Sequence, residues 1–108
     1  MNATSSLHIE RWGDDTYLVG YCIDNHQHWN PSKLRLDSFL GDNRGRFKGG
    51  GHQFTERARN ISFVPEEGAS RAPILRAELE DDTGRFLPGD VNLAERINNR
   101  DGYLQFKW

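Results

Sequence analysis

The chain has 108 residues and a formal net charge of −2 at pH 7. Its hydrophobic share of 35% and its charged share of 28% are typical of a soluble globular protein with a modest core. A small negative charge excludes a protein whose overall field recruits nucleic acid or anionic membranes. No apolar run approaches the roughly 18 residues that a membrane span needs, so we expect no membrane insertion.

The N-terminus and the cysteine content bear on the cellular compartment. Residues 1–15 have neither the basic nor the apolar region of a secretory signal peptide. Cys22 is the only cysteine, so no internal disulfide can form, and we expect its side chain to pack as a small buried hydrophobe. Both features favour a cytoplasmic protein, and export without a signal peptide stays open as an alternative.

The chain has the pattern of an all-β protein. Residues 16–23 and 72–80 have the composition of β-strands, and the second segment alternates apolar and polar residues cleanly. Residues 32–40 and 90–97 have mixed spacing. Each of these two segments predicts a short strand followed by a helical turn.

The residues around these segments predict how each copy ends. We expect Asp37 and Asn92 to cap the helical turns. A polar turn follows each helical turn, with Gly45 or Gly102 at a position where a positive φ costs little. A final strand follows each polar turn, and the second of these strands covers residues 103–108.

The chain contains two copies of one sequence unit. An offset of 57 residues superposes apolar residues and one turn glycine. The matched pairs are Cys22 with Leu79, Trp29 with Phe86, Leu34 with Val91, Leu36 with Leu93, Leu40 with Ile97, Gly45 with Gly102 and Phe47 with Leu104. Upstream, residues 8–10 match residues 60–62 at an offset of 52, and a longer loop at 64–73 absorbs the difference. Solenoids need at least three repeats, so two copies predict a pseudo-twofold pair that buries one face jointly.

Two aromatic residues occupy equivalent places in the copies. Trp29 and Phe86 are candidates for rings on which a sugar stacks. Their matched positions in an apolar pattern favour a different role, so we expect both to be core anchors.

The ordered motifs resemble those of the cyanovirin-N homologue (CVNH) family of lectins. The first copy carries them in SSLHIE and in YLVGYCIDNHQHWNPSKLRLDSFLGDNRGRFKGGGHQF, and the second in ARNISF and in ILRAELEDDTGRFLPGDVNLAERINNRDGYLQF. The resemblance covers essentially the whole chain, as a single CVNH domain. Disulfide-bearing members pair cysteines at positions that here hold Ser6 with Cys22 and Ala58 with Leu79. The chain therefore resembles the cysteine-poor members found in fungi.

The resemblance implies a fold of two pseudo-symmetric, strand-exchanged domains, each with a three-stranded sheet, a hairpin and short helical turns. One domain would take residues 1–38 with about 95–108, and the other about 39–94. The glycine-rich segment Gly49–Gly51 marks the junction of the copies, where some members carry a further module. We expect a monomer, and exchange of halves at this segment is a possible route to a dimer.

The resemblance also implies a non-catalytic lectin that needs no metal or other cofactor. Its partners would be mannose oligosaccharides or high-mannose glycoproteins, bound at terminal α1→2-linked mannose. The residue types agree with this chemistry, because a pyranose offers hydroxyls that both donate and accept hydrogen bonds. Short polar side chains and turn backbone at loop tips match such pairs of hydroxyls.

Transferred position by position, the two sites of the family fall on two sets of residues in this chain. Site A comprises Thr4, Ser5, Ile23, Asp24, Asn25, His26, Asn99, Arg100 and Asp101. Site B comprises Gly41, Asp42, Asn43, Arg44, His52, Gln53, Glu56, Arg57, Asp81, Asp82, Thr83, Gly84 and Arg85.

Both sites depart from the family pattern. Site A has Ile23 where a polar residue is usual, and residues 25–28 replace a glycine-bearing turn. Site B has Gly41 and Asp42 where an acid–Asn or Gly–Asn pair is usual, and Arg57 at a normally small position. These departures leave open whether both sites bind sugar.

Other classes of protein fit the sequence less well. A glycosidase needs two carboxylates that flank a cleft, whereas Asp14–Asp15, Glu66–Glu67 and Asp81–Asp82 are adjacent pairs in predicted loops. His26 and His28 lie on one strand face, but no further ligand is expected to converge on them, so we expect no metal site. The main alternative is a structural or protein-interaction module that keeps the scaffold without sugar affinity.

Overall fold

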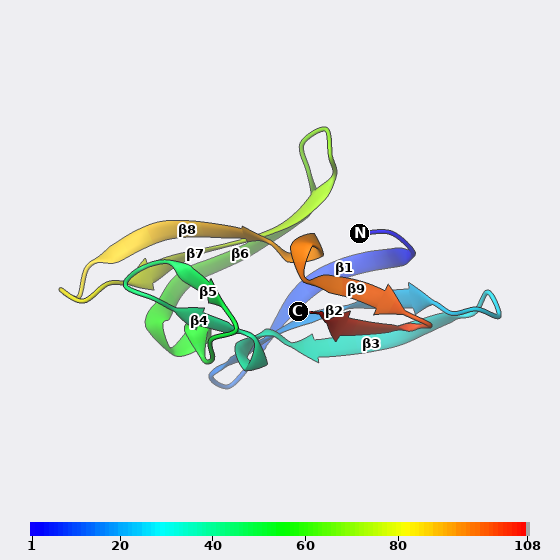
Figure 1. The fold of residues 1–108 in the computed structure, drawn as a ribbon, viewed down its shortest axis with the longest axis horizontal. Coiled ribbons are helices and arrows are strands. Elements are labelled where there is room, and N and C mark those ends of the chain that lie inside the picture. Colours follow the sequence, from blue (N-terminus) through cyan, green and yellow to red (C-terminus); the bar gives the residue numbers. More distant parts are fainter. Residues whose placement is uncertain (108) are drawn as a thin grey trace.

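The computed structural model describes residues 1–107 and is all-β (Figure 1). The molecule is elongated, with extents of 51 × 29 × 24 Å. No helix of the described residues is long and apolar enough to cross a membrane. The strands are β1 (Thr4–Trp12), β2 (Asp15–Ile23), β3 (Trp29–Arg35), β4 (Leu40–Asp42), β5 (Phe47–Gly49), β6 (Ala58–Glu67), β7 (Ala72–Glu80), β8 (Phe86–Asn92), β9 (Ile97–Arg100) and β10 (Tyr103–Phe106), and the short 3-10 turns are η1 (Leu36–Ser38), η2 (Phe54–Arg57) and η3 (Leu93–Glu95).

Each sequence copy forms one three-stranded antiparallel sheet, β1-β2-β3 or β6-β7-β8. The central strands show why, because their residues alternate between the core and the surface. In β2, Leu18 and Cys22 are fully buried, and in β7 Leu75 and Leu79 take the same role. The predicted strands at 16–23 and 72–80 are thus confirmed, and Cys22 is a buried free thiol as expected.

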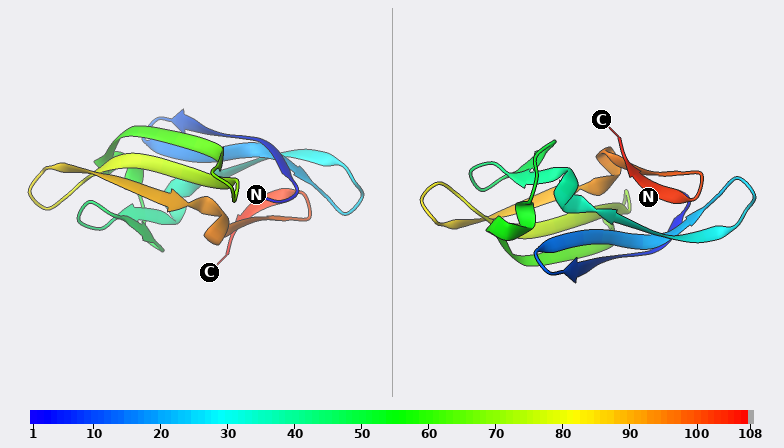
Figure 2. Two further views of the ribbon diagram at one scale, coloured as in Figure 1. Left: turned by 90° about the horizontal axis from the view of Figure 1, so that it is seen from above. Right: turned by 90° about the horizontal axis from the view of Figure 1, so that it is seen from below.

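The hairpins are exchanged between the copies. Hairpin β9–β10 lies beside β3 of the first copy, where Leu104 N donates to Ser32 Oγ at 2.9 Å. Hairpin β4–β5 lies beside β8 of the second copy. Figure 2 shows both arrangements from above and below. We call sheet β1-β2-β3 with hairpin β9–β10 half A, and sheet β6-β7-β8 with hairpin β4–β5 half B. The last predicted strand extends to Trp108, which lies outside the described residues.

The first strands of the two copies are related by an offset of 54, not the predicted 52. Thr4 pairs with Cys22, and Ala58 pairs with Leu79 at the equivalent place. Both strands then bulge at equivalent residues, Ser6 with a φ of 55° and Asn60 with a φ of 53°. The residue opposite Cys22 is therefore Thr4, and the expected pairing of Ser6 with Cys22 is wrong. The predicted loop at 64–73 is mostly strand, since β6 and β7 form a hairpin.

The aromatic residues that we expected in the core differ from each other. Trp29 is 50% exposed, so the prediction that it anchors the core is wrong. Phe86 is half-buried, and the guanidinium carbon of Arg59 lies 4.1 Å from its ring centroid. The apolar pattern located both side chains on strands but did not show which one is covered.

The glycines between the copies meet a local steric need. Gly50 has a φ of +83°, and a Cβ on Gly51 would lie 2.9 Å from the Cα of Gly41. Only glycine allows this close approach of two backbones. Exchange of halves between two chains at this segment stays a prediction.

A buried polar cluster joins η1 to the start of β2 and to η2. The carboxylate of Asp37 is fully buried and accepts from Thr16 N at 2.7 Å, from Thr55 N at 2.9 Å and from Thr55 Oγ1 at 2.7 Å. Asp37 therefore lies within η1 and does not cap it, contrary to our prediction. The predicted cap of η3 is confirmed, because Asn92 accepts from Ala94 N at 3.0 Å.

These contacts predict very different costs for two substitutions. Asp37→Ala leaves two buried backbone N–H groups without an acceptor and should lower the free energy of unfolding by about 3 kcal/mol. Asn92→Ala removes one exposed cap and should cost about 1 kcal/mol. Urea denaturation of both variants gives the comparison. Equal losses would contradict the role assigned to Asp37.

Candidate functional site

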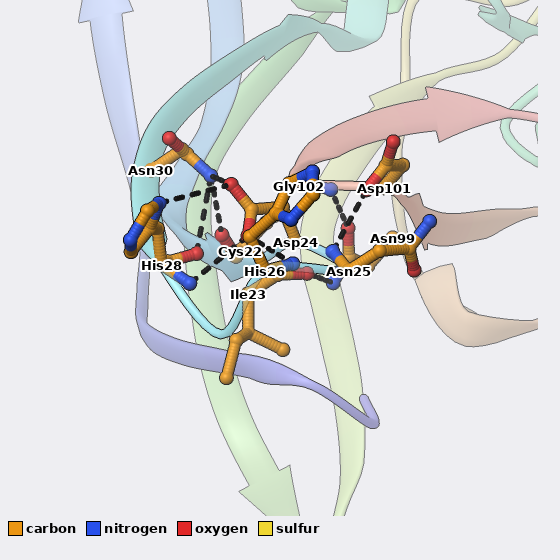
Figure 3. A network of polar contacts seen from close by, with 10 residues as sticks. All are labelled: Cys22, Ile23, Asp24, Asn25, His26, His28, Asn30, Asn99, Asp101 and Gly102. Carbon is orange, nitrogen blue, oxygen red and sulfur yellow. Dashed lines mark hydrogen bonds and ion pairs between the residues drawn. The ribbon is translucent and has the colours of Figure 1, made fainter.

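Half A ends in two polar connections at one tip of the molecule. We call Asp24–His28 loop A and Asn99–Gly102 turn A. The side-chain amide of Asn99 joins three segments. Its Nδ2 donates to Ile23 O at 2.8 Å and its Oδ1 accepts from Gly102 N at 2.9 Å (Figure 3). The same Nδ2 also donates to Ala3 O at 2.9 Å. Asn99 thereby fixes turn A against the N-terminal segment and the end of β2.

The carboxylate of Asp24 organises loop A. Its Oδ1 accepts from the backbone N–H groups of His26 and His28, each at 2.9 Å, and its Oδ2 accepts from Asn30 Nδ2 at 3.0 Å. The Asn30 amide, followed by the His28 N–H, favours the charged form and lowers the pKa of Asp24 to about 2. Gly102 has a φ of +97°, which strains any other residue, and a Cβ there would lie 2.7 Å from Asn30 Nδ2 and 3.0 Å from Asp24 Cβ.

Loop A and turn A contact each other directly. Asn25 N donates to Asp101 Oδ1 at 2.8 Å, across 76 positions of sequence. The side chains of Asn25, His26 and Arg100 are exposed around this contact. The structure thus brings seven of the predicted site A residues together, which are Ile23, Asp24, Asn25, His26, Asn99, Arg100 and Asp101.

The two predicted N-terminal residues lie differently. Thr4 Oγ1 donates to Met1 O at 2.8 Å, and Ser5 is an exposed strand residue opposite Tyr21. The residue that contacts turn A is Ala3, through its carbonyl oxygen. The corrected offset of 54 would have found it, since it aligns Ala3 with the predicted site B residue Arg57.

A cavity of about 450 Å³ adjoins half A. Its lining includes Met1, Ala3, Arg71, Asn98 and Asn99. Asn98 Oδ1 is buried without a hydrogen-bond partner among the described residues. Our site A prediction missed Asn98, although the offset of 57 aligns it with Gly41 of site B.

Half B ends in equivalent connections at the opposite tip (Figure 1). We call Asp42–Gly45 turn B and Asp81–Arg85 loop B. Asp81 organises loop B as Asp24 does loop A, because its Oδ1 accepts from Thr83 Oγ1 at 2.7 Å, from Thr83 N at 2.8 Å and from Arg85 N at 3.0 Å. The Thr83 hydroxyl is the main cause of the lowered pKa of Asp81.

Turn B is held by charge where turn A is held by an amide. Asp42 takes the place of Asn99, and its Oδ1 accepts from Gly45 N at 2.8 Å. The side chain of Asp42 is fully buried, and its Oδ2 has no hydrogen bond but lies 3.5 Å from Arg57 Nε. A carboxylate cannot donate to carbonyl oxygens as Asn99 does. Because a buried charge is costly without a partner, Arg57 compensates the charge of Asp42.

Half B has further ion pairs at positions where half A has uncharged residues or a backbone hydrogen bond. Arg57 Nη2 lies 3.5 Å from Glu80 Oε1, whereas the equivalent residues of half A are Ala3 and Ile23. Arg44 Nε lies 3.2 Å from Asp82 Oδ2 at the place of the contact between Asp101 and Asn25. The arginines of half B thus reach across the surface between turn B and loop B.

The remaining predicted residues of site B surround these pairs. Gly41 forms a bridge with Gln53, and a Cβ on Gly41 would lie 2.8 Å from His52 N. Gln53 N donates to Asp37 O at 2.9 Å, so Gln53 serves the junction of the halves. The exposed residues of this set are Asn43, His52, Glu56, Thr83, Gly84 and Arg85.

This fold and these paired tips define a two-repeat β-protein of the CVNH lectin type. Residues 2–105 match the CVNH domain, so the chain belongs to the CVNH family. A cyanovirin-N homolog from Neurospora crassa is 48% identical over 80 residues, which cover 74% of this chain and 72% of the relative. Lectins are generally not enzymes, and nothing in these matches indicates catalysis.

Solved structures of the family agree with the fold. The N. crassa homologue superposes with a TM-score of 0.89 at 39% identity, covering 99% of this chain and 96% of that one. A designed cyanovirin-N homolog lectin gives 0.88 at 40% identity, covering 98% and 96%. A microvirin:mannobiose complex gives 0.79 at 24% identity, covering 96% and 94%, a likeness of fold alone.

The hydrogen bonds of Asp24 predict a pH dependence in the acid range. Because its folded pKa of about 2 lies below the ordinary value of 3.8, the carboxylate stabilises loop A above pH 3.8. This stabilisation should be lost as the pH falls through about 2. NMR titration of the Asp24 carboxyl carbon measures the midpoint, and Asp24→Asn is the control for shifts of the His26 and His28 amides. A midpoint near 3.8 would mean that the bonds do not favour the charged form.

Proposed function

We propose that this protein is a non-catalytic, metal-independent lectin that binds terminal α1→2-linked mannose, with half A as its principal site. The observation that carries the proposal is the bridge made by Asn99, which holds the N-terminal segment, the end of β2 and turn A in one rigid arrangement. Rigid polar groups lose little conformational entropy when they bind a hydroxylated ligand.

The exposed groups of half A suit a sugar. Asn25 and His26 offer groups that donate and accept, and Asp101 offers an acceptor beside them. Within the fold, microvirin has been solved with mannobiose and a variant of MoCVNH3 with (N-GlcNAc)4. These complexes concern those proteins, and they support a saccharide as the kind of ligand.

Half B is the weaker site in this proposal. Arg57 faces both Asp42 and Glu80, so a sugar that enters must displace or accommodate a paired guanidinium. Half A has the small side chain of Ala3 at the equivalent position. The two tips lie at opposite ends of a 51 Å molecule, so any engagement of half B would let one protein link two glycans.

The first test removes one exposed carboxylate of half A. Asp101→Ala takes away the acceptor of Asn25 N and should weaken α1→2-mannobiose binding at least tenfold, measured by isothermal titration calorimetry. The matched control is Arg44→Ala, which changes the equivalent position of half B and breaks only an exposed ion pair of small energetic value. The proposal fails if wild type releases no heat with mannobiose, which would favour a protein-interaction module, or if the two variants lose affinity equally.

The second test converts half B to the arrangement of half A. The double variant Asp42→Asn with Arg57→Ala places an amide and a small residue where half A has Asn99 and Ala3. We expect tighter mannobiose binding at half B, seen as a stoichiometry that rises toward two sites per chain. Arg57→Ala alone should unfold more easily, because it leaves the Asp42 carboxylate buried without its cation. No change in stoichiometry would contradict the assignment of Arg57 as the obstacle.

A further inference from the structure

The outer face of the half A sheet carries aromatic rings that the core does not use. Tyr21 is 47% exposed and Trp29 is 50% exposed. Both side chains project from the face opposite to buried Cys22, because alternate residues of a strand point to opposite sides. A contiguous exposed apolar patch marks a binding surface, whereas a single exposed apolar residue needs no explanation.

This aromatic surface is continuous with the end of half A. Ile23 pairs directly with Trp29, and Tyr21 pairs with Pro31 on the same face. Directly opposed side chains lie about 5 Å apart at Cβ, and diagonal ones about 7 Å, so Tyr21, Ile23 and Trp29 form one cluster. The carbonyl of Ile23 accepts from Asn99, while its side chain points away from the polar network (Figure 3). The cluster therefore lies at the base of loop A, on the side of the strands that faces away from the Asn99 network.

The equivalent positions of half B do not form an open aromatic surface. Glu78 replaces Tyr21 and is paired with Arg59 at 3.3 Å, and Glu80 replaces Ile23. Phe86 replaces Trp29, but the Arg59 guanidinium lies over its ring at 4.1 Å. The second copy thus shows how this face looks when it is closed by the protein's own charges.

We propose that Trp29, with Tyr21 and Ile23, forms an additional subsite on which a further residue of a longer mannose chain stacks. The inference rests on the proposed function of half A and extends it. One face of a pyranose presents C–H groups, which pack on an aromatic ring, while its hydroxyls stay in water. Continuity with the polar site makes a sugar chain leaving loop A the occupant that fits.

The charges around the cluster disfavour nucleic acid, the other ligand that stacks on tryptophan. A strand of nucleic acid needs cations along its backbone. Tyr21, Ile23, Trp29 and Pro31 are uncharged, and the protein as a whole carries a charge of −2. The cation beyond Pro31 on this face of β3 is Lys33, whose Nζ lies 4.3 Å from the Trp12 ring centroid and 4.0 Å from Glu10 Oε1. A neutral ligand with an apolar face meets these conditions.

The experiment compares two sugars with matched variants. Wild type should bind α1→2-mannotriose about tenfold more tightly than α1→2-mannobiose, since the longer chain adds one stacking contact. Trp29→Ala should remove most of that difference and leave the affinity for mannobiose within about twofold, while Trp29→Phe should retain part of it. Phe86→Ala is the control at the equivalent position. Trp12→Ala is a second control, because Trp12 is also exposed but lies at the other end of the same sheet, where it pairs with Asp15.

The outcomes separate this inference from the proposed function. If wild type binds neither sugar, the lectin assignment fails and the subsite fails with it. If wild type binds both sugars equally, or if Trp29→Ala weakens both by the same factor, the subsite alone is overturned. A change of molecular mass in Trp29→Ala, measured by light scattering, would assign the surface to self-association and would also overturn it.

Discussion

The structure depends on how each polar turn is fastened to the two chain segments beside it. In half A the fastening group is the side-chain amide of Asn99, which donates to two carbonyl oxygens and accepts from the N–H of its own turn. An amide can do both, so the position of Asn99 needs no paired cation. The carboxylates of Asp24 and Asp101 hold the rest of this tip through backbone N–H groups. At Asn99 the hairpin from the other copy meets the N-terminal segment and the end of β2. The site of half A therefore depends on the exchange of hairpins.

Asp42 at the equivalent position of half B makes the two tips chemically different. Its buried carboxylate keeps the contact with its own turn but loses both donors, and the cation of Arg57 takes their place. Arg57 supplies the cation beside this buried acid, at the position where half A has Ala3. The same trend continues along the sheet, where half A exposes Tyr21 and Trp29 and half B presents ion pairs over Phe86. The two copies of one unit therefore differ at their tips: half B is crossed by ion pairs of Arg57, and half A has no such pairs at the equivalent positions.

The sequence predicted the features that recur with a fixed period. The alternation in β2 and β7, the positive φ of Gly45 and Gly102 and the cap at Asn92 all follow from local rules. The repeat implied a pseudo-twofold pair, and the resemblance to the CVNH family implied the exchanged architecture. Three features depend on contacts that no local pattern contains. The bulges at Ser6 and Asn60 shift the register of β1 against β2 and of β6 against β7. The offset of 52 assigned to these first strands was wrong, so Ala3 was missed at the site. Asp37 looked like a cap because its partner Thr55 lies on a distant turn. Trp29 matched an apolar position of the repeat, but that pattern does not show whether a neighbour covers the ring. In half B the guanidinium of Arg59 covers Phe86, whereas Trp29 is exposed.

We propose that half A, which is held by the amide of Asn99, binds mannose more tightly than half B, where Arg57 forms ion pairs. Site-resolved NMR titration of the wild-type protein with α1→2-mannobiose tests it most directly, because each tip reports through its own backbone amides. We expect the amides of Asn25 and Asn99–Gly102 to shift at lower sugar concentration than those of Asp42–Gly45 and Asp82. Shifts that appear first at Asp42–Gly45, or that follow one common curve at both tips, would contradict it.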